Sequence, residues 1–454
     1  MKQKVVSNLY IFYTIILTLF IINTFIKNEH ISYIVGVLAI LMLLVSFSGA
    51  DKLFKVIGTI FLVTGIFLYL YSGLPFKDLP FYMTSTLPLL AFLMVLPWMN
   101  SCVRAGRFDR QINDAMKANV SDLGKLYVRS SLTTYSLVTF INLSALTISQ
   151  DILLENMKKM KKKVKDVFIS KTTLRTFAVA LAWSPMEILV AMTVDATGVS
   201  YLRFLPWLIL CSLLVFSVDL FIGRRVFASI PYSSPLNNKR EVNVRKLSWK
   251  LFQLFIVLSV FLFTVVSIGN VFHLNFILSV TLVILPFTFC WAMIMKRTRS
   301  FLAIGWRTWK LRTNNMQNFI VLFIALAFFS NSLNETPFLA LIQHPFLSSE
   351  SPLIILLLIQ FTYLIMSLIG VHPIATIGVL IEVLTPLFDV MNPLSIGIVM
   401  ITGALATLSV GAYGMMVTIT VMNTKQNPYL ITLRNMPFGL FYGGVGTLIA
   451  YLLL

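Results

Sequence analysis

Two ionisable side chains stand out because each lies within a strongly apolar stretch: Glu187, two residues after Ser184-Pro185, and His372, directly before Pro373. A carboxyl group inside a membrane-embedded segment is costly, and it indicates a site that binds a cation or carries a proton. An imidazole changes its charge near neutral pH, so it can carry a proton or contact an anion. The simpler alternatives are a carboxylate held by a helix N-terminus and a turn histidine bonded to nearby carbonyl groups.

The residues around His372 interrupt a helix. In LIGVHPIATIGVL (residues 368–380), Gly370 permits a turn and Pro373 cannot continue the preceding helix. The apolar run Pro352–Phe388 would be about 55 Å long as a straight helix, which is too long for one membrane span and too short for two. We therefore predict a hairpin whose turn lies at Gly370–Pro373, and irregular backbone of this kind needs a protein-lined cavity or a buried place.

The composition is that of a membrane protein. The chain has 454 residues, of which 58% are hydrophobic and 12% charged, with a mean hydropathy of +0.87. Soluble domains average about 25% charged residues, and apolar runs of about 20 residues recur along this chain. We predict an all-α polytopic membrane protein with about 11 transmembrane helices and two re-entrant hairpins. Ser7–Ile26 is too long for a signal-peptide core and is predicted to be a retained first span.

The net charge of +19 reflects basic loops, which orient a chain in the bilayer, and we expect no nucleic-acid binding. The charge pattern predicts a multi-pass protein of the bacterial cytoplasmic membrane with its N-terminus in the cytoplasm, leaving only Lys27, Lys77 and Arg203 outside. The basic run at residues 158–165 is expected to contact anionic lipids.

Several classes of site have no counterpart in the sequence. The three cysteines are widely spaced, and we find no metal-ligand cluster, phosphate-binding glycine loop or nucleophile motif. We therefore expect no catalytic residue, no metal and no cofactor apart from a co-transported H⁺ or Na⁺, and we do not expect an enzyme.

A second hairpin is predicted from charge. As a single span, Ser130–Leu154 would place the basic loop that follows it outside the cell, against the positive-inside rule. As a re-entrant hairpin at about 128–156, it keeps that loop in the cytoplasm. The polar tip Ile141–Ser144 then divides two arms, each too short to cross alone.

Three stretches match one another at an offset of about 230 residues: LAFLMVLPWMNS with VLFIALAFFSNS, LSALTIS with HPIATIG, and AWSPM with AYGMM. Asn100 falls inside and Asn331 outside, so the two repeats have inverted topology, which is typical of secondary transporters. The predicted division is an extra span (1–30), repeat 1 (31–223), a cytoplasmic linker (224–250) and repeat 2 (251–454). Repeat 1 carries a broken helix at about 176–198; repeat 2 carries the outer hairpin at about 352–388 and a broken helix at about 393–422.

This pattern resembles the ion transporter superfamily, whose best-known branch is the divalent anion/sodium symporters. The resemblance covers nearly the whole chain, and AWSPMEILVAMTVDATGVSY (182–201) is similar to the family's interrupted helix. The symporters carry Ser-Asn-Thr at both hairpin tips, where it binds sodium and the substrate carboxylate. The matching positions here are Asn142-Leu143-Ser144 and Val371-His372-Pro373, so half of the first motif remains and the second is replaced. The departure concerns the residues for sodium coupling and dicarboxylate specificity, and it affects the implied fold and transport class less.

The resemblance implies a site formed by the two hairpin tips and the two helix breaks, where half-helices expose unpaired N–H and C=O groups. The expected substrate-binding residues are Asn142, Ser144, Trp183, Ser184, His372, Pro373, Thr376 and Tyr413. The expected coupling-ion or proton residues are Glu187, His372, Gly411 and Gly414. Hydrogen bonds to their own helices and plain packing are the alternatives. Asp219 is expected to pair with Arg224 or Arg225 at a membrane end, and no buried Arg or Lys is expected at the site.

The sequence therefore predicts a secondary active transporter of elevator type, not driven by ATP, that moves a small organic anion with proton or cation coupling and works as a homodimer. A cation/proton antiporter with the same fold also fits Glu187 and His372. A membrane enzyme or assembly subunit acting on lipid-linked substrates is a further alternative, but it would need a set of acids and bases near one membrane face.

Overall fold

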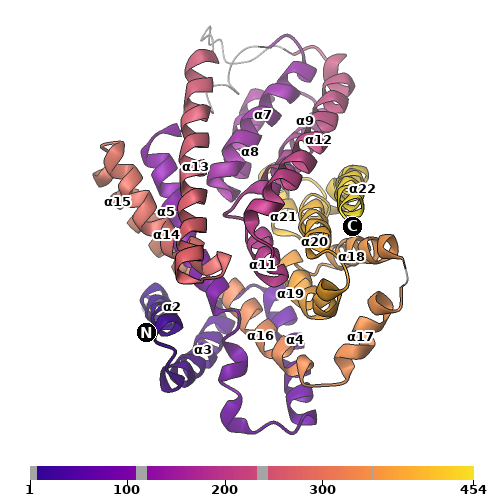
Figure 1. Ribbon diagram of the computed structural model, residues 1–454. Helices are drawn as coiled ribbons and strands as arrows, with labels where there is room; N and C mark the ends of the chain where they lie inside the picture. The colour runs from indigo at the N-terminus through magenta and orange to yellow at the C-terminus, as the bar shows by residue number, and fades with distance from the viewer. Residues whose placement is uncertain (1–7, 109–119, 233–243, 350) are drawn as a thin grey trace. The chain divides into compact units, whose positions relative to one another are not determined.

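The computed structural model describes residues 8–108, 120–232, 244–349 and 351–454, and regular structure within them is helical. The chain forms two compact units, each built from several segments; Figure 1 labels the helices of both. Unit 1 comprises Met1–Cys102, Ile268–Ser348 and Gly378–Pro386, and unit 2 comprises Val103–Ser267, Ser349–Ile377 and Leu387–Leu454. Each unit thus combines segments from both predicted repeats, and the predicted linker at 224–250 does not separate the two units.

Unit 1 holds the early spans and their partners from the second half of the chain. Its helices are α2 (Leu9–Ile26), α3 (Glu29–Gly49), α4 (Lys52–Tyr71), η1 (Phe76–Asp78), η2 (Phe81–Met83), α5 (Leu87–Ala105), α14 (Phe276–Ile294), α15 (Thr298–Asn314), α16 (Gln317–Asn334) and α17 (Phe338–Leu347). The helix α16 is the centre of this unit, where it packs against α3 and α4.

Unit 2 holds the hairpins and the broken helices. Its first segment carries α7 (Leu123–Ile141), α8 (Leu143–Asn156), α9 (Lys162–Ser170), η3 (Lys171–Arg175), α10 (Thr176–Ala180), η4 (Leu181–Trp183), α11 (Ile188–Thr197), α12 (Tyr201–Ala228) and most of α13 (Val244–Phe272). Its later segments carry α18 (Pro352–Leu368), the first part of α19 (Pro373–Leu384), the end of η5 (Thr385–Asp389), α20 (Pro393–Thr407), α21 (Met415–Thr424) and α22 (Pro428–Leu452).

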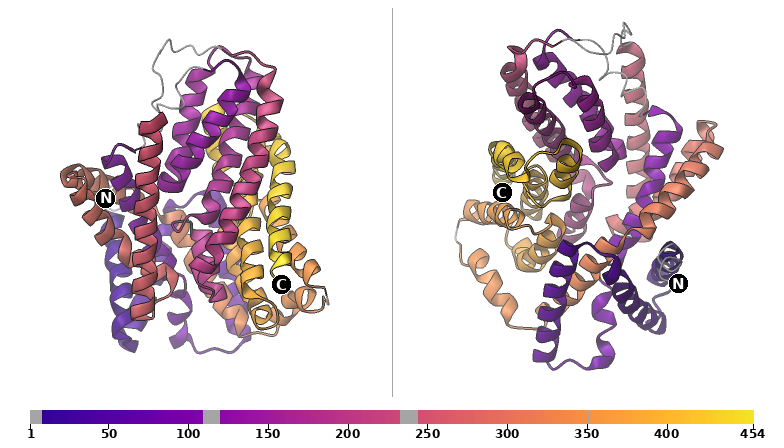
Figure 2. Two further views of the ribbon diagram at one scale, coloured as in Figure 1. Left: turned by 45° about the horizontal axis from the view of Figure 1, so that its top comes forward. Right: turned by 180° about the vertical axis from the view of Figure 1, so that it is seen from behind.

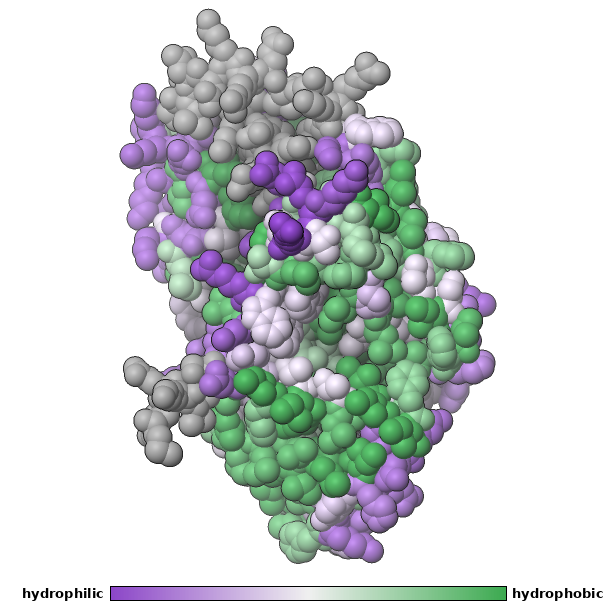
Figure 3. Space-filling view, turned by 90° about the vertical axis from the view of Figure 1, so that its left-hand side faces the viewer, coloured by the Kyte–Doolittle hydropathy of each residue, from purple (hydrophilic) through white to green (hydrophobic). Residues whose placement is uncertain are grey.

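The predicted fold class, an all-α multi-pass membrane protein, is confirmed. Within the described residues, nine helical segments are long and apolar enough to cross a membrane. They coincide with nine of the predicted spans, whereas the tenth is divided into α20 and α21 and the eleventh is α22. Large apolar side chains such as Ile15, Leu44 and Val63 are more than half exposed, as lipid-facing residues are, and apolar residues cover much of the face in Figure 3.

Within unit 1, contacts between helix ends show which ends share a side. The Tyr10 N–H at the start of α2 donates to Asn314 Oδ1 (3.3 Å), and the Asp51 N–H before α4 donates to Asn318 Oδ1 near the start of α16 (2.7 Å). At the other end of α16, Asn331 Nδ2 donates to the Tyr82 carbonyl in the loop before α5 (2.8 Å). The helices therefore alternate in direction as the predicted layout requires; which side is cytoplasmic stays a prediction.

Each predicted hairpin tip coincides with a turn between two helices. The helices α7 and α8 lie side by side and meet at Asn142 (φ 42°, ψ −126°), and Thr134 Oγ1 donates to Ser149 Oγ (3.0 Å) across the pair (Figures 1 and 2). The second turn lies between α18 and α19 at Gly370 (φ 96°). That these turns lie at membrane depth stays a prediction.

The two helix breaks also lie where the sequence predicts them. The first, Ser184–Glu187, separates η4 from α11, and the second, Leu408–Gly414, separates α20 from α21. The first broken helix begins earlier than its predicted start, at Lys162, and continues through the π-helical turn η3. Hydropathy marks only the apolar part of such a helix, whereas its hydrogen bonds continue through the polar residues before it.

Candidate functional site

The inner hairpin tip contacts the first helix break. Asn142 Nδ2 donates to Glu187 Oε2 over 3.4 Å, which is long for a hydrogen bond. Glu187 is buried, with 7% of its surface exposed, and it occupies the N-cap position of α11. Its side chain faces the amides of Ile188 and Leu189 without the geometry of a capping hydrogen bond. A buried carboxyl at the positive end of a helix, beside a neutral amide, can bind a cation or carry a proton.

A chain of aromatic and hydroxyl groups fixes the backbone on the other side of this break. Trp183 Nε1 donates to Tyr135 Oη (2.6 Å), and Tyr135 Oη and Ser212 Oγ share a hydrogen bond (2.7 Å). The Tyr201 hydroxyl donates to the Trp183 carbonyl. Trp183, which we predicted to bind substrate, is half-buried and joins η4 to α7 and α12 through these bonds.

The outer hairpin tip also contacts the second helix break, through close packing at two glycines. The Tyr413 ring lies against Gly370, where a Cβ atom would be 3.2 Å from Tyr413 Cδ2. Ser367 Oγ lies against Gly411, where a Cβ atom would be 2.6 Å away. Gly414 is the N-cap residue of α21, and its N–H donates to the Gly411 carbonyl (2.9 Å). The two glycines of the break thus allow close approach of the tip and a tight backbone turn.

His372 and Pro373 form the start of α19. His372 is half-buried, and its Nδ1 accepts a hydrogen bond from the Ile374 N–H (3.2 Å), so this turn contact is made to an amide and not to a carbonyl group. Tyr413 is half-exposed (49%), and its hydroxyl shares a hydrogen bond with that of Tyr429. The tip therefore presents an imidazole and a phenol on neighbouring elements.

The remaining predicted residues flank the same tips and breaks. Ser144 is half-buried in the first turn of α8, and Thr376 is buried in the first turns of α19. Ser184 is buried at the first break, where its Oγ accepts from the Met186 N–H (3.4 Å). The structure thus pairs Asn142 with Glu187 and Gly370 with Tyr413, and it places these three hydroxyl groups beside those pairs. Their roles in binding stay predictions.

Replacing Gly370 by alanine is expected to destabilise the protein by about 1–3 kcal/mol, because L-residues are strained at a positive φ of this kind. The new methyl group would also press on the Tyr413 ring. The free energy of unfolding, from titration with a denaturing detergent, measures the change. Gly444→Ala is the control, because a Cβ atom there meets open space; an equal loss at both positions would contradict the expected strain.

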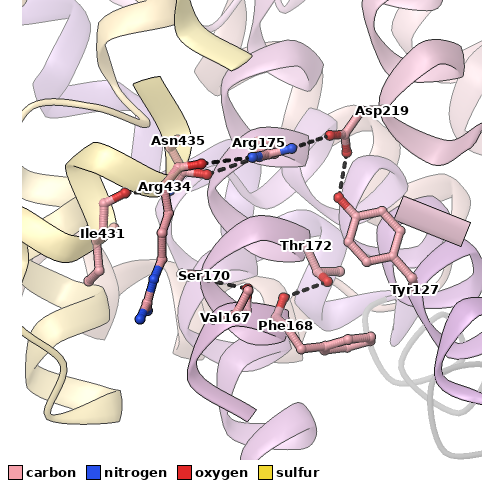
Figure 4. A network of polar contacts seen from close by, with 10 residues as sticks. All are labelled: Tyr127, Val167, Phe168, Ser170, Thr172, Arg175, Asp219, Ile431, Arg434 and Asn435. Atoms are coloured by element: carbon pink, nitrogen blue, oxygen red, sulfur yellow. Dashed lines mark hydrogen bonds and ion pairs between the residues drawn. The ribbon is translucent and has the colours of Figure 1, made fainter. Parts of the chain in front are cut away.

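A second polar network in unit 2 was not predicted from the sequence (Figure 4). Arg175 Nη1 donates to Asp219 Oδ1 (2.9 Å), and the Tyr127 hydroxyl donates to Asp219 Oδ2 (2.6 Å). Arg175 Nε donates to Asn435 Oδ1 (2.9 Å), and Arg175 Nη2 donates to the Arg434 carbonyl (3.0 Å). The network therefore joins four segments: α7, η3, α12 and α22.

One expectation is corrected by this network. Asp219 pairs with Arg175 and not with Arg224 or Arg225, and Arg225 instead stacks on the Phe221 ring. Arg175 is itself buried (9% exposed), but it lies outside the tips and breaks, which is where no buried Arg or Lys was expected. The available signal was weak: Arg175 precedes a long apolar run, and a cation next to such a run is usually assigned to the membrane boundary.

A third network links the inner hairpin to the second broken helix. Gln150 Nε2 donates to Thr420 Oγ1 (2.8 Å) and to Thr173 Oγ1 (3.1 Å), and Gln150 Oε1 accepts from Asn423 Nδ2 (2.9 Å). The amide thus connects α8 with η3 and α21. Segments from the two predicted repeats are therefore tied together inside one compact unit.

The described part of the chain contains no group of three or more His, Cys, Asp or Glu side chains that could hold a metal ion. The arrangement offers one buried carboxyl, one half-buried imidazole, several hydroxyl and amide groups, and the N-terminal ends of four helices. Such groups can bind an ion or a small polar solute.

Comparisons with known proteins find similarity among solved structures. No protein-family model matches the chain, and no curated protein matches its sequence. The solved structure of the YdaH transporter from Alcanivorax borkumensis is similar, with a TM-score of 0.61 over 87% of this chain and 98% of that chain, at 13% sequence identity. At this identity the similarity concerns the fold. The chain is thus a multi-pass helical membrane protein whose fold is also that of a transporter.

Proposed function

We propose that the protein is a secondary active transporter whose binding site is formed by the two hairpin tips and the two helix breaks of unit 2. The observation that carries this proposal is the paired geometry, in which Asn142 of one tip contacts Glu187 of one break and Gly370 of the other tip contacts Tyr413 of the other break. Membership of the ion transporter superfamily is part of the proposal, supported by the fold and by the inverted repeat.

The substrate that we propose is a small organic anion. Four helices begin at the tips and breaks: α8 at Leu143, α11 at Ile188, α19 at Pro373 and α21 at Met415. At α8 and α21, the first N–H groups have no partner within the helix and carry a partial positive charge, so they attract anions without any basic side chain. The α19 start adds little, because Pro373 has no N–H and the Ile374 N–H donates to His372 Nδ1, and the α11 start is faced by the Glu187 carboxyl. Asn142, Ser144 and Thr376 would add neutral polar contacts to such an anion.

Glu187 is our proposed coupling residue, and it would carry either a proton or a bound cation during transport. It is the buried acidic side chain at the tips and breaks, and Asn142 links it to the hairpin that we expect to contact substrate. The same observation favours a second candidate function, a cation/proton antiporter, in which Glu187 binds both ions in turn and no organic anion is needed.

An elevator-type movement fits the division of the chain. Both tips, both breaks, α12 and α22 belong to unit 2, which is the composition expected of a moving unit, while most early spans belong to unit 1. We further propose a homodimer in the bacterial cytoplasmic membrane, with the N-terminus in the cytoplasm. These parts of the proposal rest on the resemblance and on the charge pattern.

The test is transport by the purified full-length protein in liposomes loaded with a pH-sensitive dye. A panel of mono-, di- and tricarboxylates is added outside, with and without a sodium gradient. We expect at least one anion to drive proton or sodium-dependent uptake, and Glu187→Gln to reduce this coupled flux to background. Glu29→Gln is the matched control, because Glu29 is exposed in the first turn of α3, outside the site.

Three outcomes would contradict parts of this proposal. Proton release driven by sodium alone, with no response to any anion, would support the antiporter. Unchanged coupled flux in Glu187→Gln would remove Glu187 from the coupling step. Turnover of a lipid-linked compound without any dependence on gradients would support a membrane enzyme.

A further inference from the structure

Helix α15 (Thr298–Asn314) is basic and amphipathic, and it directly follows the apolar span α14 in unit 1. Residues 296–314 contain no acidic residue, and their basic residues are Lys296, Arg297, Arg299, Arg307, Lys310 and Arg312. Two tryptophans, Trp306 and Trp309, lie among them. Arginine, lysine and tryptophan on one helix are typical of helices that lie in the interface of a bilayer.

The contacts of α15 place it at the ends of the spans. The chain reverses between α14 and α15, where Lys296 takes a left-handed conformation (φ 55°) and the Arg297 N–H donates to the Ala292 carbonyl (2.9 Å). Near the other end of α15, Trp309 packs edge-on against Tyr10 in the first turn of α2, with ring centroids 5.6 Å apart. Because α14 ends and α2 begins beside α15, this helix lies at one side of unit 1.

The inward side of α15 is aromatic. Phe301 is buried against Trp98 of α5, with ring centroids 5.4 Å apart, and the Trp98 ring also lies against Gly305. Gly305 allows this approach, because a side chain there would overlap the Trp98 ring. The inward side therefore fixes the rotation of α15 about its axis and decides which residues face outward.

The outward side is a mixture of basic and large apolar side chains, which we call the α15 basic face. It consists of Arg299, Leu302, Trp306, Arg307, Lys310 and Leu311. Trp306 is 56% exposed and Leu311 is 61% exposed, and the Lys310 Nζ lies 4.8 Å from the centre of the Tyr10 ring. Neighbouring Met293 and Ile294, at the end of α14, are exposed as well.

We propose that the α15 basic face binds the phosphate headgroups of anionic phospholipids, with Trp306 and Leu311 in the acyl-chain boundary beneath them. Charge complementarity supports this occupant, since the face carries only positive charges and each basic residue near an anionic surface is attracted to it. Continuity with the exposed apolar residues of α14 favours a lipid over an acidic protein, because a protein partner would have to displace lipid from these residues. The inference does not depend on the transport proposal.

The test uses the intrinsic fluorescence of Trp306 in the purified full-length protein. The protein is reconstituted in phosphatidylcholine vesicles that contain equal fractions of either brominated phosphatidylglycerol or brominated phosphatidylcholine, and bromine quenches nearby tryptophans. Subtracting the signal of Trp306→Phe isolates this residue from the others. We expect a preference of about fivefold or more for the anionic lipid, as attraction by one or more basic residues gives.

Two matched variants identify the charges responsible. R299Q/R307Q/K310Q is expected to bring the preference close to one, whereas K27Q/K77Q/R203Q, which removes the same charge from other exposed positions, should leave it unchanged. If the first variant does not fold, the wild-type protein still tests the charges, because raising the salt concentration should weaken the preference. Three results would each overturn the proposal. The first is equal quenching by both lipids, and the second is a preference that neither salt nor R299Q/R307Q/K310Q changes. The third is a Trp306 that neither lipid quenches, as when a bound acidic protein covers it.

Discussion

Replacing Arg175 by methionine is expected to lower the free energy of unfolding by about 3–5 kcal/mol, because removing one partner leaves the other charge buried and unpaired. Asp219 would keep only the Tyr127 hydroxyl of the two partners that the structure gives it, with 4% of its side chain exposed. Asn435 and the Arg434 carbonyl would lose their donors at the same time. The measurement is unfolding by a denaturing detergent, followed by tryptophan fluorescence.

Arg225→Met is the matched control, because it removes the same type of side chain from the helix that carries Asp219. Arg225 is exposed and stacks on Phe221, so its loss should cost less than about 1 kcal/mol. The double variant R175M/D219L should recover much of the lost stability, since apolar replacement of a whole buried pair is often close to neutral. Equal losses in the Arg175 and Arg225 variants would show that Asp219 does not depend on Arg175.

The positions of the tips and breaks could be predicted because their signals are local. Proline and glycine at Gly370–Pro373 and at Ser184-Pro185 stop a helix wherever it lies, and the structure has a turn or a break at both places. The prediction of the inner tip at Asn142 rests on charge, since the basic loop after it is expected to stay in the cytoplasm. Each of these signals can be recognised within a few residues of the feature that it predicts.

The partners of Arg175 could not be predicted because they are distant in sequence and the local rule pointed elsewhere. Asn435 lies 260 residues from Arg175, and Asp219 lies 44 residues away. Arg224 and Arg225 looked closer to Asp219, but residues pair along a helix at spacings of three or four, and neither arginine has that spacing. Arg225 is instead four residues from Phe221, and it contacts the Phe221 ring. The spacing rule thus argues against pairing Asp219 with Arg224 or Arg225, but only the three-dimensional fold identifies Arg175 as its partner.

The helix α15 was missed for a related reason. Its residues are too basic for a span, so hydropathy predicts no element there. Its apolar residues Phe301, Gly305 and Trp309 recur every four positions, which is the spacing of one helix face. This periodicity indicates a helix with one buried face. The average hydropathy does not, because the polar residues of the other face lower it.

Replacing Asn142 by glycine is expected to move stability and transport in opposite directions. Asn142 has φ 42° and ψ −126°, a conformation that only glycine adopts freely, and such strain costs about 1–3 kcal/mol. Glycine would relieve it at a cost of about 0.5–1 kcal/mol in the entropy of the unfolded chain, so a net gain in stability of about 0.5–2 kcal/mol is expected. The same change removes the amide that contacts Glu187.

If Glu187 and Asn142 act together in binding, losing this contact should reduce transport in liposomes about tenfold or more, as expected from a hydrogen bond to a charged group. Lys425→Gly is the matched control: Lys425 also has a positive φ of 57°, at the end of α21, so glycine there should stabilise the protein without altering transport. A gain in both stability and transport for Asn142→Gly would mean that the tip needs only its backbone shape. Stability gained while transport is lost would mean that the chain keeps a strained asparagine at this tip for the side chain that it presents to Glu187.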